Sequence, residues 1–135
     1  MSEPTRRPRI LVCEDDFGSR KILSRILSSV GIVDTASNGR EAVDAVAAGM
    51  AGEERYDIIA LDLQMPEMGG HDALKEIRRR EEELGHERAT ILITTANEET
   101  SSVMEAFREQ CDGYLLKPIR RADLLGKLAD LGHEV

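Results

Sequence analysis

Five short apolar segments alternate with five helix-like segments, and this alternation constrains the fold more than any other feature of the sequence. The apolar, β-branched segments expected to be strands are 9–13, 32–37, 57–62, 90–95 and 113–117. The segments expected to be helices are 19–31, 38–50, 70–85, 98–111 and 121–132. Strands that are apolar on both faces indicate a parallel sheet with helices on both sides. Right-handed crossovers between such strands predict a doubly wound α/β domain.

Length and composition predict a single domain. A chain of 135 residues is close to the size of one domain, and its 41% of apolar residues are enough for one core. Residues 1–8 contain two prolines and no periodic pattern, so we expect a flexible tail before a domain that covers 9–133. In the helix expected at 70–85, Leu74, Ile77 and Leu84 should face inward, and the charged run 78–83 should be a solvated helix end.

The charge balance argues against several classes of partner. The 26 acidic and 18 basic residues give a net charge of -8, so the chain should repel DNA, RNA and anionic membranes. The N-terminal segment lacks the apolar stretch of a signal peptide, and no segment approaches the roughly 20 apolar residues of a membrane span. We therefore expect a cytoplasmic protein in which Cys13 and Cys111 are buried, reduced thiols.

Polar and charged residues gather where the predicted strands end. At the ends of the first, third, fourth and fifth strands stand, in order, Glu14, Asp15 and Asp16; Asp62; Thr94, Thr95 and Ala96; and Lys117 with Pro118. In open parallel sheets, ligands bind outside the carboxyl ends of the strands. We therefore expect three or four carboxylates, a hydroxyl and an amine to share one edge of the fold.

Each of these residues alone has a common structural explanation. Asp often caps a helix or forms a turn, an acidic triplet is usually a solvated loop, and a proline suits the first position of a helix. Carboxylates brought together from separate strands, however, repel one another unless a cation lies between them. Their hard oxygens suit Mg²⁺, with Mn²⁺ as a substitute. Asp62 is then expected to be a nucleophile that forms an aspartyl phosphate, with Lys117 and Thr95 holding phosphoryl oxygens.

Four motifs, taken together, carry a family resemblance. In order along the chain they are RILVCEDDFGSRKILSRIL, LDLQMPEMGG, ITTA and GYLLKPI. Together they resemble the receiver domain of bacterial two-component response regulators from about residue 9 to residue 131. The resemblance implies a flavodoxin-like, five-stranded parallel sheet of order 2-1-3-4-5. It also implies phosphorylation of one Asp by a histidine kinase or a histidine phosphotransfer protein, and a signalling role rather than an enzymatic one.

The resemblance also assigns a metal site. By position, Asp62 matches the phospho-acceptor, which also contacts the metal. Asp15 matches the direct Mg²⁺ ligand, and Glu14 matches the acid that acts through water. Gln64, two residues after the acceptor, matches the position whose backbone carbonyl binds the metal. Asp16 is a further acid to which the resemblance assigns only a contribution to the local potential.

A phosphate-binding and switching set follows in the second half of the chain. Thr95 matches the switch hydroxyl, and Ala96 matches the small residue beside it, whose backbone N–H reaches the phosphoryl group. Lys117 matches the phosphate-binding lysine, and its bond to the following proline is cis in such domains. Tyr114 matches the aromatic switch whose rotamer follows Thr95. Gln64 and Asn97 stand where side chains tune dephosphorylation, so the phosphoryl lifetime stays open.

The output is expected to be a contact with another protein. Phosphorylation should change the packing of the face formed by residues 98–131, which is then the surface for a downstream target. The chain after Pro118 is long enough for one helix. We therefore expect a stand-alone regulator, either of the chemotaxis type or an intermediate in a phosphorelay, with self-catalysed phosphoryl acceptance and slow autodephosphorylation only.

Three other functions are compatible with parts of this pattern. A constitutive adaptor of the same fold would take no phosphate, and the complete set of matched site residues counts against it. A metal-dependent phosphohydrolase of the haloacid-dehalogenase type would need a second Asp two residues after the first, where this chain has Gln64. A flavin-binding domain would place its phosphate near Glu14, Asp15 and Asp16, which repel it.

Overall fold

The computed structural model describes residues 7–65, 67–96, 105, 106, 108 and 110–135. Its strands are β1 (Arg9–Cys13), β2 (Ile32–Ala36), β3 (Ile58–Asp62), β4 (Thr90–Thr95) and β5 (Gly113–Leu116). Its helices are α1 (Phe17–Leu27), α2 (Gly39–Ala51), α3 (Gly70–Leu84) and α5 (Arg121–Asp130). The strands form one parallel sheet of order β2-β1-β3-β4-β5, which confirms the predicted fold. The helix expected at 98–111 lies largely outside the described residues. Within that range, the described residues 105, 106 and 108 are helical.

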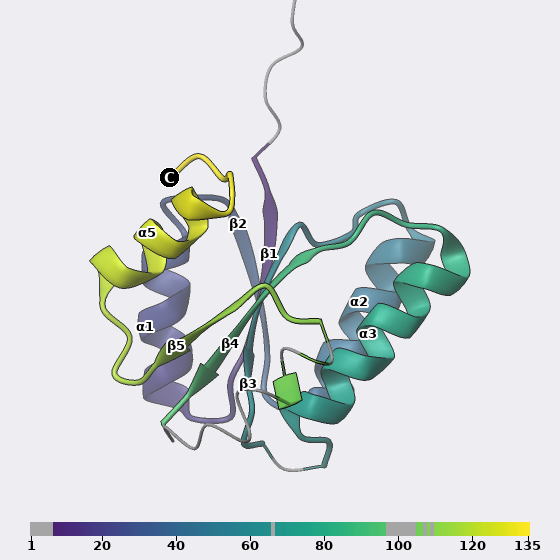
Figure 1. Ribbon diagram of the computed structural model, residues 1–135, viewed down its shortest axis with the longest axis horizontal. Coiled ribbons are helices and arrows are strands. Elements are labelled where there is room, and N and C mark those ends of the chain that lie inside the picture. Colours follow the sequence, from purple (N-terminus) through teal and green to yellow (C-terminus); the bar gives the residue numbers. More distant parts are fainter. Residues whose placement is uncertain (1–6, 66, 97–104, 107, 109) are drawn as a thin grey trace, which may run out of the picture.

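Two layers of helices cover the sheet. Helices α1 and α5 lie on one face and helices α2 and α3 on the other (Figure 1). Side chains of β1 alternate between the two cores: Ile10 and Val12 belong to the cluster under α1 and α5, whereas Leu11 and Cys13 belong to the other. Burial on both faces explains why the central strands are continuously apolar. Both cysteines are buried and free.

Helix α1 begins and ends earlier than the sequence suggested. It starts at Phe17 because Asp16, to which only a local potential was assigned, is its N-cap: the Asp16 carboxylate accepts the Ser19 N–H at 2.8 Å. The helix ends at Leu27 and not at Gly31. Gly31 instead allows a close approach of the backbone at Pro8, because a Cβ at position 31 would lie 2.2 Å from the carbonyl oxygen of Pro8.

Helix α3 corrects two expectations. Leu74 and Ile77 are fully buried as expected, but Leu84 is 60% exposed. The run 78–83 is not simply a solvated helix end, because Arg78 and Glu81 are buried and bind each other at 2.8 Å. This ion pair occupies the inward face near the end of the helix, and Leu84 is left in solvent.

The ends of the described chain lie at the amino edge of the sheet. Arg7 donates hydrogen bonds to the carbonyls of Ser28 at 2.9 Å and Gly31 at 3.2 Å, and Ile32 donates to the carbonyl of Pro8 at 2.9 Å. The first six residues of the expected tail lie outside the described residues. No helix in the described part of the chain has both the length and the apolar composition of a membrane span.

Candidate functional site

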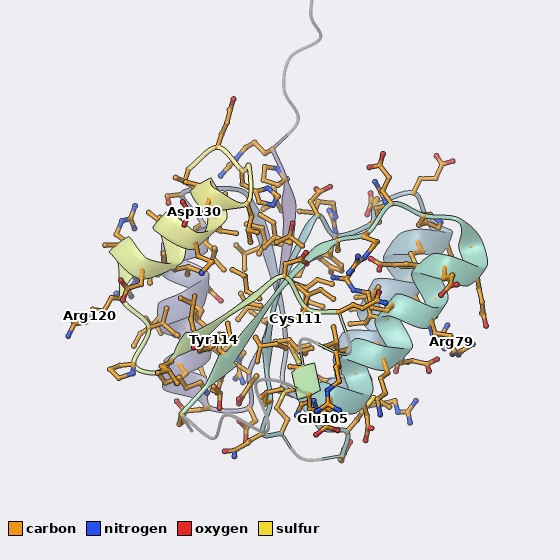
Figure 2. All side chains as sticks on the ribbon, in the orientation of Figure 1. Arg79, Glu105, Cys111, Tyr114, Arg120 and Asp130 are labelled. Carbon is orange, nitrogen blue, oxygen red and sulfur yellow. The ribbon has the colours of Figure 1, made fainter. Side chains whose placement is uncertain are left out.

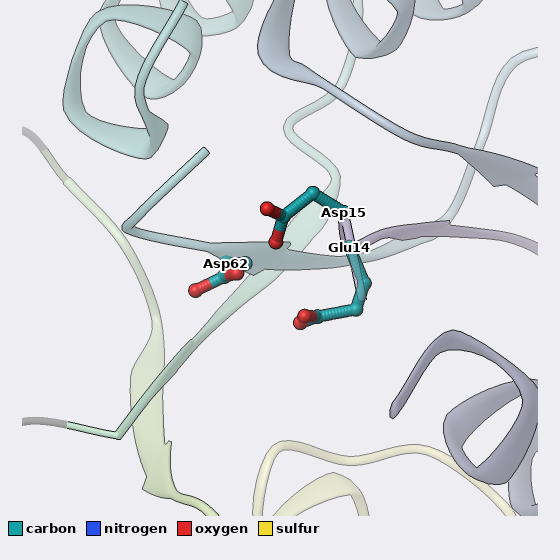
Figure 3. Close-up of side chains that lie close together, drawn as sticks. All are labelled: Glu14, Asp15 and Asp62. Carbon is teal, nitrogen blue, oxygen red and sulfur yellow. The ribbon is translucent and has the colours of Figure 1, made fainter. Parts of the chain in front are cut away.

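Three carboxylates meet at the carboxyl edge of the sheet. Cys13 pairs with Leu61, so Glu14, which follows β1, lies beside Asp62 at the end of β3. Glu14 is fully buried and Asp62 is 3% exposed, whereas Asp15 is exposed. One carboxylate oxygen from each of the three residues lies within 4.8 Å of the others (Figure 3). The structure therefore brings together the acids that the sequence predicted to converge.

Lys117 reaches these acids from the segment after β5. Its Nζ lies 2.8 Å from Oε1 and 2.7 Å from Oε2 of Glu14, and 3.3 Å from Oδ2 of Asp62. Burial alone would lower the pKa of Lys117, but its hydrogen bond to Glu14 and the charges of both carboxylates outweigh burial and raise this pKa. Lys117 is therefore a fixed positive charge next to the Asp62 side chain.

The Asp62 carboxyl is held in an environment that opposes its ionisation. Burial is the main cause that raises its pKa to about 6, and the neighbouring charge of Glu14 adds to this effect. The backbone N–H of Gln64, 3.2 Å from Oδ1, and the Lys117 ammonium act in the opposite direction. A cation at this edge would relieve the penalty of holding Asp62 and Glu14 ionised side by side.

Two glycines allow the loop after Asp62 to fold against the sheet. Helix α3 begins so close to β3 that a Cβ on Gly70 would lie 2.4 Å from the carbonyl oxygen of Asp62. The Gly70 N–H donates to the carbonyl of Leu63 at 3.0 Å. On the other side of the loop, the N–H of Gly39 donates to the carbonyl of Met68 at 3.1 Å, and a Cβ on Gly39 would lie 2.1 Å from that oxygen. These close contacts hold the loop after Asp62 against α2 and the end of β3.

The donor set fits a hard divalent cation. Glu14, Asp15 and Asp62 offer carboxylate oxygens, which Mg²⁺ prefers over nitrogen or sulfur. Oε2 of Glu14 is buried and lies 2.7 Å from the Lys117 ammonium, so this oxygen already faces a positive charge. The exposed Asp15 leaves one side of the cluster open to water, which Mg²⁺ retains in most protein sites.

The phosphate-binding and switch candidates lie on the two neighbouring strands. Thr95 ends β4 and is buried, and its carbonyl accepts the Lys117 N–H at 2.8 Å. Ala96 follows it and is exposed. Tyr114 lies on β5 with a 40% exposed side chain (Figure 2). The Lys117–Pro118 bond is cis, as the resemblance implied.

Thr94, which the sequence placed at the end of the fourth strand without a role, lies in the site. It pairs with Asp62 across the β3–β4 ladder and is fully buried, and its Oγ1 has no hydrogen-bond partner among the described residues. Strand alternation places Glu14, Asp62 and Thr94 in one row on the α1 and α5 side of the sheet. The signal in the sequence was the polar pair Thr94-Thr95 at the end of an apolar strand.

The fold and the carboxylate–lysine site define a class of protein, the α/β signalling domains of the receiver type. The chain matches the response regulator receiver domain family over residues 10–129. It therefore belongs to the receiver-domain family of two-component signalling proteins, whose members bind Mg²⁺ and interact with histidine kinases or phosphotransfer proteins.

Similar proteins occur in two contexts. Hybrid signal transduction histidine kinase L of Dictyostelium discoideum is 34% identical over 117 residues, which are 86% of this chain but 7% of that protein. The response regulator MprA of Mycolicibacterium vanbaalenii is 34% identical over 124 residues, 91% of this chain and 49% of that protein. The chain thus spans less than half the length of these curated relatives.

Solved receiver domains have the same fold. The receiver domain of the histidine kinase CKI1 from Arabidopsis thaliana, as a D1050A mutant, superposes with a TM-score of 0.82 at 28% identity, covering 93% of this chain and 90% of that one. CheY from Borrelia burgdorferi, in a complex with CheX, BeF₃ and Mg, superposes with a TM-score of 0.81 at 26% identity and the same coverage.

Proposed function

We propose that the chain is a receiver that accepts a phosphoryl group on Asp62 from a histidine kinase or a histidine phosphotransfer protein, in a Mg²⁺-dependent reaction. The observation that carries the proposal is the meeting of Asp62 with two further acids and the Lys117 ammonium at one sheet edge. An Asp that only ended a strand would need neither the two neighbouring acids nor the lysine ammonium.

The chemistry follows from the placement of the side chains. A carboxylate oxygen of Asp62 attacks the phosphorus of a phosphohistidine, so that a P–O bond forms and the P–N bond breaks, and the leaving imidazole takes up a proton. The Lys117 ammonium binds a phosphoryl oxygen, and Thr95 and the backbone N–H of Ala96 bind others. Glu14, Asp15, Asp62 and the carbonyl of Gln64 would hold Mg²⁺, or Mn²⁺ as a substitute. The bound ion would neutralise negative charge at this edge of the sheet.

The signal is proposed to leave through the face formed by residues 98–131. Phosphorylation adds roughly two negative charges and three acceptor oxygens at Asp62. Thr95 would turn toward these oxygens, and Tyr114, now 40% exposed, would turn inward. A downstream protein that binds this face would respond to the change, so the chain transmits a signal and converts no external substrate.

The receiver unit is proposed to cover residues 9–133 and to act as a separate protein. Relatives include hybrid kinases and a response regulator of which this chain covers 49%, so the size of the native polypeptide distinguishes a separate receiver from part of either kind of protein. An immunoblot of the source cells should show a single band near 15.0 kDa. Any larger band would contradict a separate protein: a band near twice this mass would indicate a longer response regulator, and one several times larger would indicate a hybrid kinase.

Phosphoryl acceptance is tested by intact mass. The protein is incubated with acetyl phosphate and Mg²⁺, with an EDTA control and an Asp62→Asn variant. The proposal predicts one phosphoryl adduct that needs Mg²⁺, is released by hydroxylamine and is absent from the variant. If the protein stays unmodified both with acetyl phosphate and with a phosphorylated histidine kinase as the donor, the result would contradict the proposal. It would favour a constitutive adaptor.

A further inference from the structure

Arg20 holds the backbone from which two of the three clustered acids project. It lies in the first turns of α1, and its Nη1 donates a hydrogen bond to the carbonyl of Glu14 at 2.9 Å and a longer one to the carbonyl of Asp15 at 3.4 Å. These carbonyls stand in the turn between β1 and α1, beyond Cys13, which is the last paired residue of β1. The guanidinium therefore ties the turn back onto the helix that follows it.

Phe17 fixes the guanidinium in turn. The Arg20 Cζ lies 5.6 Å from the centroid of the Phe17 ring, a cation–π contact. The Phe17 side chain is 67% exposed and packs in neither core. The contact with the Phe17 ring restricts the Arg20 side chain. The guanidinium therefore loses little further conformational entropy when it binds the two carbonyls.

Asp15 is the acid that most needs this support. Glu14 is fully buried and is held by Lys117, and Asp62 is held by the backbone N–H of Gln64. Asp15 is exposed, and the contact with Arg20 fixes its backbone rather than its carboxylate. The position of this carboxylate therefore depends on how firmly the turn is held.

We propose that Arg20 is a positioning residue for the divalent cation, acting through the backbone of Glu14 and Asp15 with Phe17 as its support. This inference rests on the proposed Mg²⁺ site. Groups that orient metal ligands without touching the metal commonly change metal affinity by about 10–100-fold when they are removed. Arg20 acts one step further from the cation, through backbone carbonyls, so an effect near the lower end is expected.

The charge of Arg20 works against its positioning effect. A cation close to the site repels Mg²⁺, so the loss of the charge alone should tighten Mg²⁺ binding. A variant that loses the charge and nevertheless binds Mg²⁺ more weakly can only have lost the positioning contact. The two effects have opposite signs, which makes the inference testable by the direction of the change.

The experiment is a calorimetric titration of the full chain with Mg²⁺ in phosphate-free buffer. The variants are Arg20→Met, which removes contact and charge, and Arg20→Lys, which keeps the charge but loses the planar fork. The matched control is Lys21→Met, because Lys21 is an exposed residue of the same helix and its replacement also removes one positive charge. Unfolding of each variant in EDTA, monitored by circular dichroism, shows whether that variant is folded.

The inference predicts that Arg20→Met weakens Mg²⁺ binding about tenfold and Arg20→Lys about threefold. Lys21→Met should bind Mg²⁺ as tightly as the wild type or more tightly. If the Arg20→Met variant is folded and binds Mg²⁺ with unchanged or higher affinity, the inference is overturned. If the wild type binds no Mg²⁺, the proposed metal site itself is overturned. If Arg20→Met does not fold, Phe17→Ala decides, because removal of the exposed ring should weaken Mg²⁺ binding and unchanged affinity would refute the role.

Discussion

At the scale of single residues, the row formed by Glu14, Asp62 and Thr94 sets the stability of the site. All three side chains are buried, and the Thr94 hydroxyl has no hydrogen-bond partner among the described residues. Leaving a buried polar group unpaired costs about 1–3 kcal/mol. Such a cost is expected at a site that is proposed to receive a cation and a phosphoryl group.

Replacement of Thr94 by Val should stabilise the protein. The substitution keeps the shape of the side chain and removes the buried hydroxyl, so the free energy of unfolding should rise by about 1 kcal/mol. Urea denaturation in EDTA measures the change, and Thr94→Ser, which keeps the hydroxyl, is the control. A loss of stability in Thr94→Val would show that the hydroxyl has a partner, such as a bound water.

Asp62→Asn should also stabilise the metal-free protein, with a defined pH dependence. The pKa of Asp62 rises from 3.8 to about 6 on folding, so the protonated form is favoured in the folded state. The stability that this gives is present below the unfolded pKa and is lost as the pH rises through 6. At pH 7 in EDTA, the variant should gain about 1–3 kcal/mol in the free energy of unfolding, and near pH 4 the gain should vanish. An equal gain at both pH values would contradict this account.

At the scale of elements, a buried ionic cluster joins α3 to the starts of β4 and β5. Arg78 binds Glu81 at 2.8 Å, the carbonyls of Ala89 and Gln110 at 2.9 and 3.0 Å, and Asp112 at 2.9 Å. Glu81 also accepts the N–H of Ala89 at 2.7 Å. The cluster replaces apolar contacts at the end of the helix, and it explains why two charged residues are buried there.

Loss of one partner in this cluster should be costly. Arg78→Met leaves Glu81 charged, buried and without its ion pair, so the free energy of unfolding should fall by about 3–5 kcal/mol. Arg79→Met, on the exposed side of the same helix, should change it by less than about 0.5 kcal/mol. Chemical denaturation of both variants measures the difference. Equal, small effects would mean that the Arg78 contacts contribute little.

The start of α3 gives a second prediction for elements. Gly70→Ala places a Cβ 2.4 Å from the Asp62 carbonyl oxygen, so either the helix or β3 must shift, and we expect a loss of at least about 2 kcal/mol. Gly126→Ala in α5, where nothing lies within 4 Å of the new Cβ, should instead stabilise the protein by about 0.5–1 kcal/mol. Thermal unfolding measures both changes. A neutral Gly70→Ala would show that the helix can retreat from the sheet at no cost.

Residue patterns predicted the elements well where one physical rule acted alone. Apolar runs such as the one ending at Asp62 predicted the buried strands, because only a parallel sheet buries both faces of a strand. The start of α1 differs from the prediction because the apolar periodic pattern begins after Phe17 and does not reveal that Asp16, expected only to add to the local potential, is the N-cap. Leu84 was placed inward because the periodic pattern does not reveal that Arg78 and Glu81 find partners on other elements.

At the scale of the whole molecule, the strand order brings distant parts of the sequence to one edge. The three acids and Lys117 lie on three separate strands or the segments that follow them, and their convergence was predicted from the rule for parallel sheets. The contacts of Arg20 and the unpaired hydroxyl of Thr94 could not be predicted in this way. They depend on side-chain directions within the assembled site, which a sequence pattern does not contain.

The central claim is that Asp62, and no other residue of the acidic cluster, takes the phosphoryl group. The most direct measurement is to phosphorylate the protein with acetyl phosphate and Mg²⁺, reduce the acyl phosphate with borohydride and sequence the peptides by mass spectrometry. Reduction converts a phosphorylated Asp into homoserine. The account predicts homoserine at position 62 alone, whereas a reduced residue at Asp15 or Asp16 with Asp62 intact would contradict it.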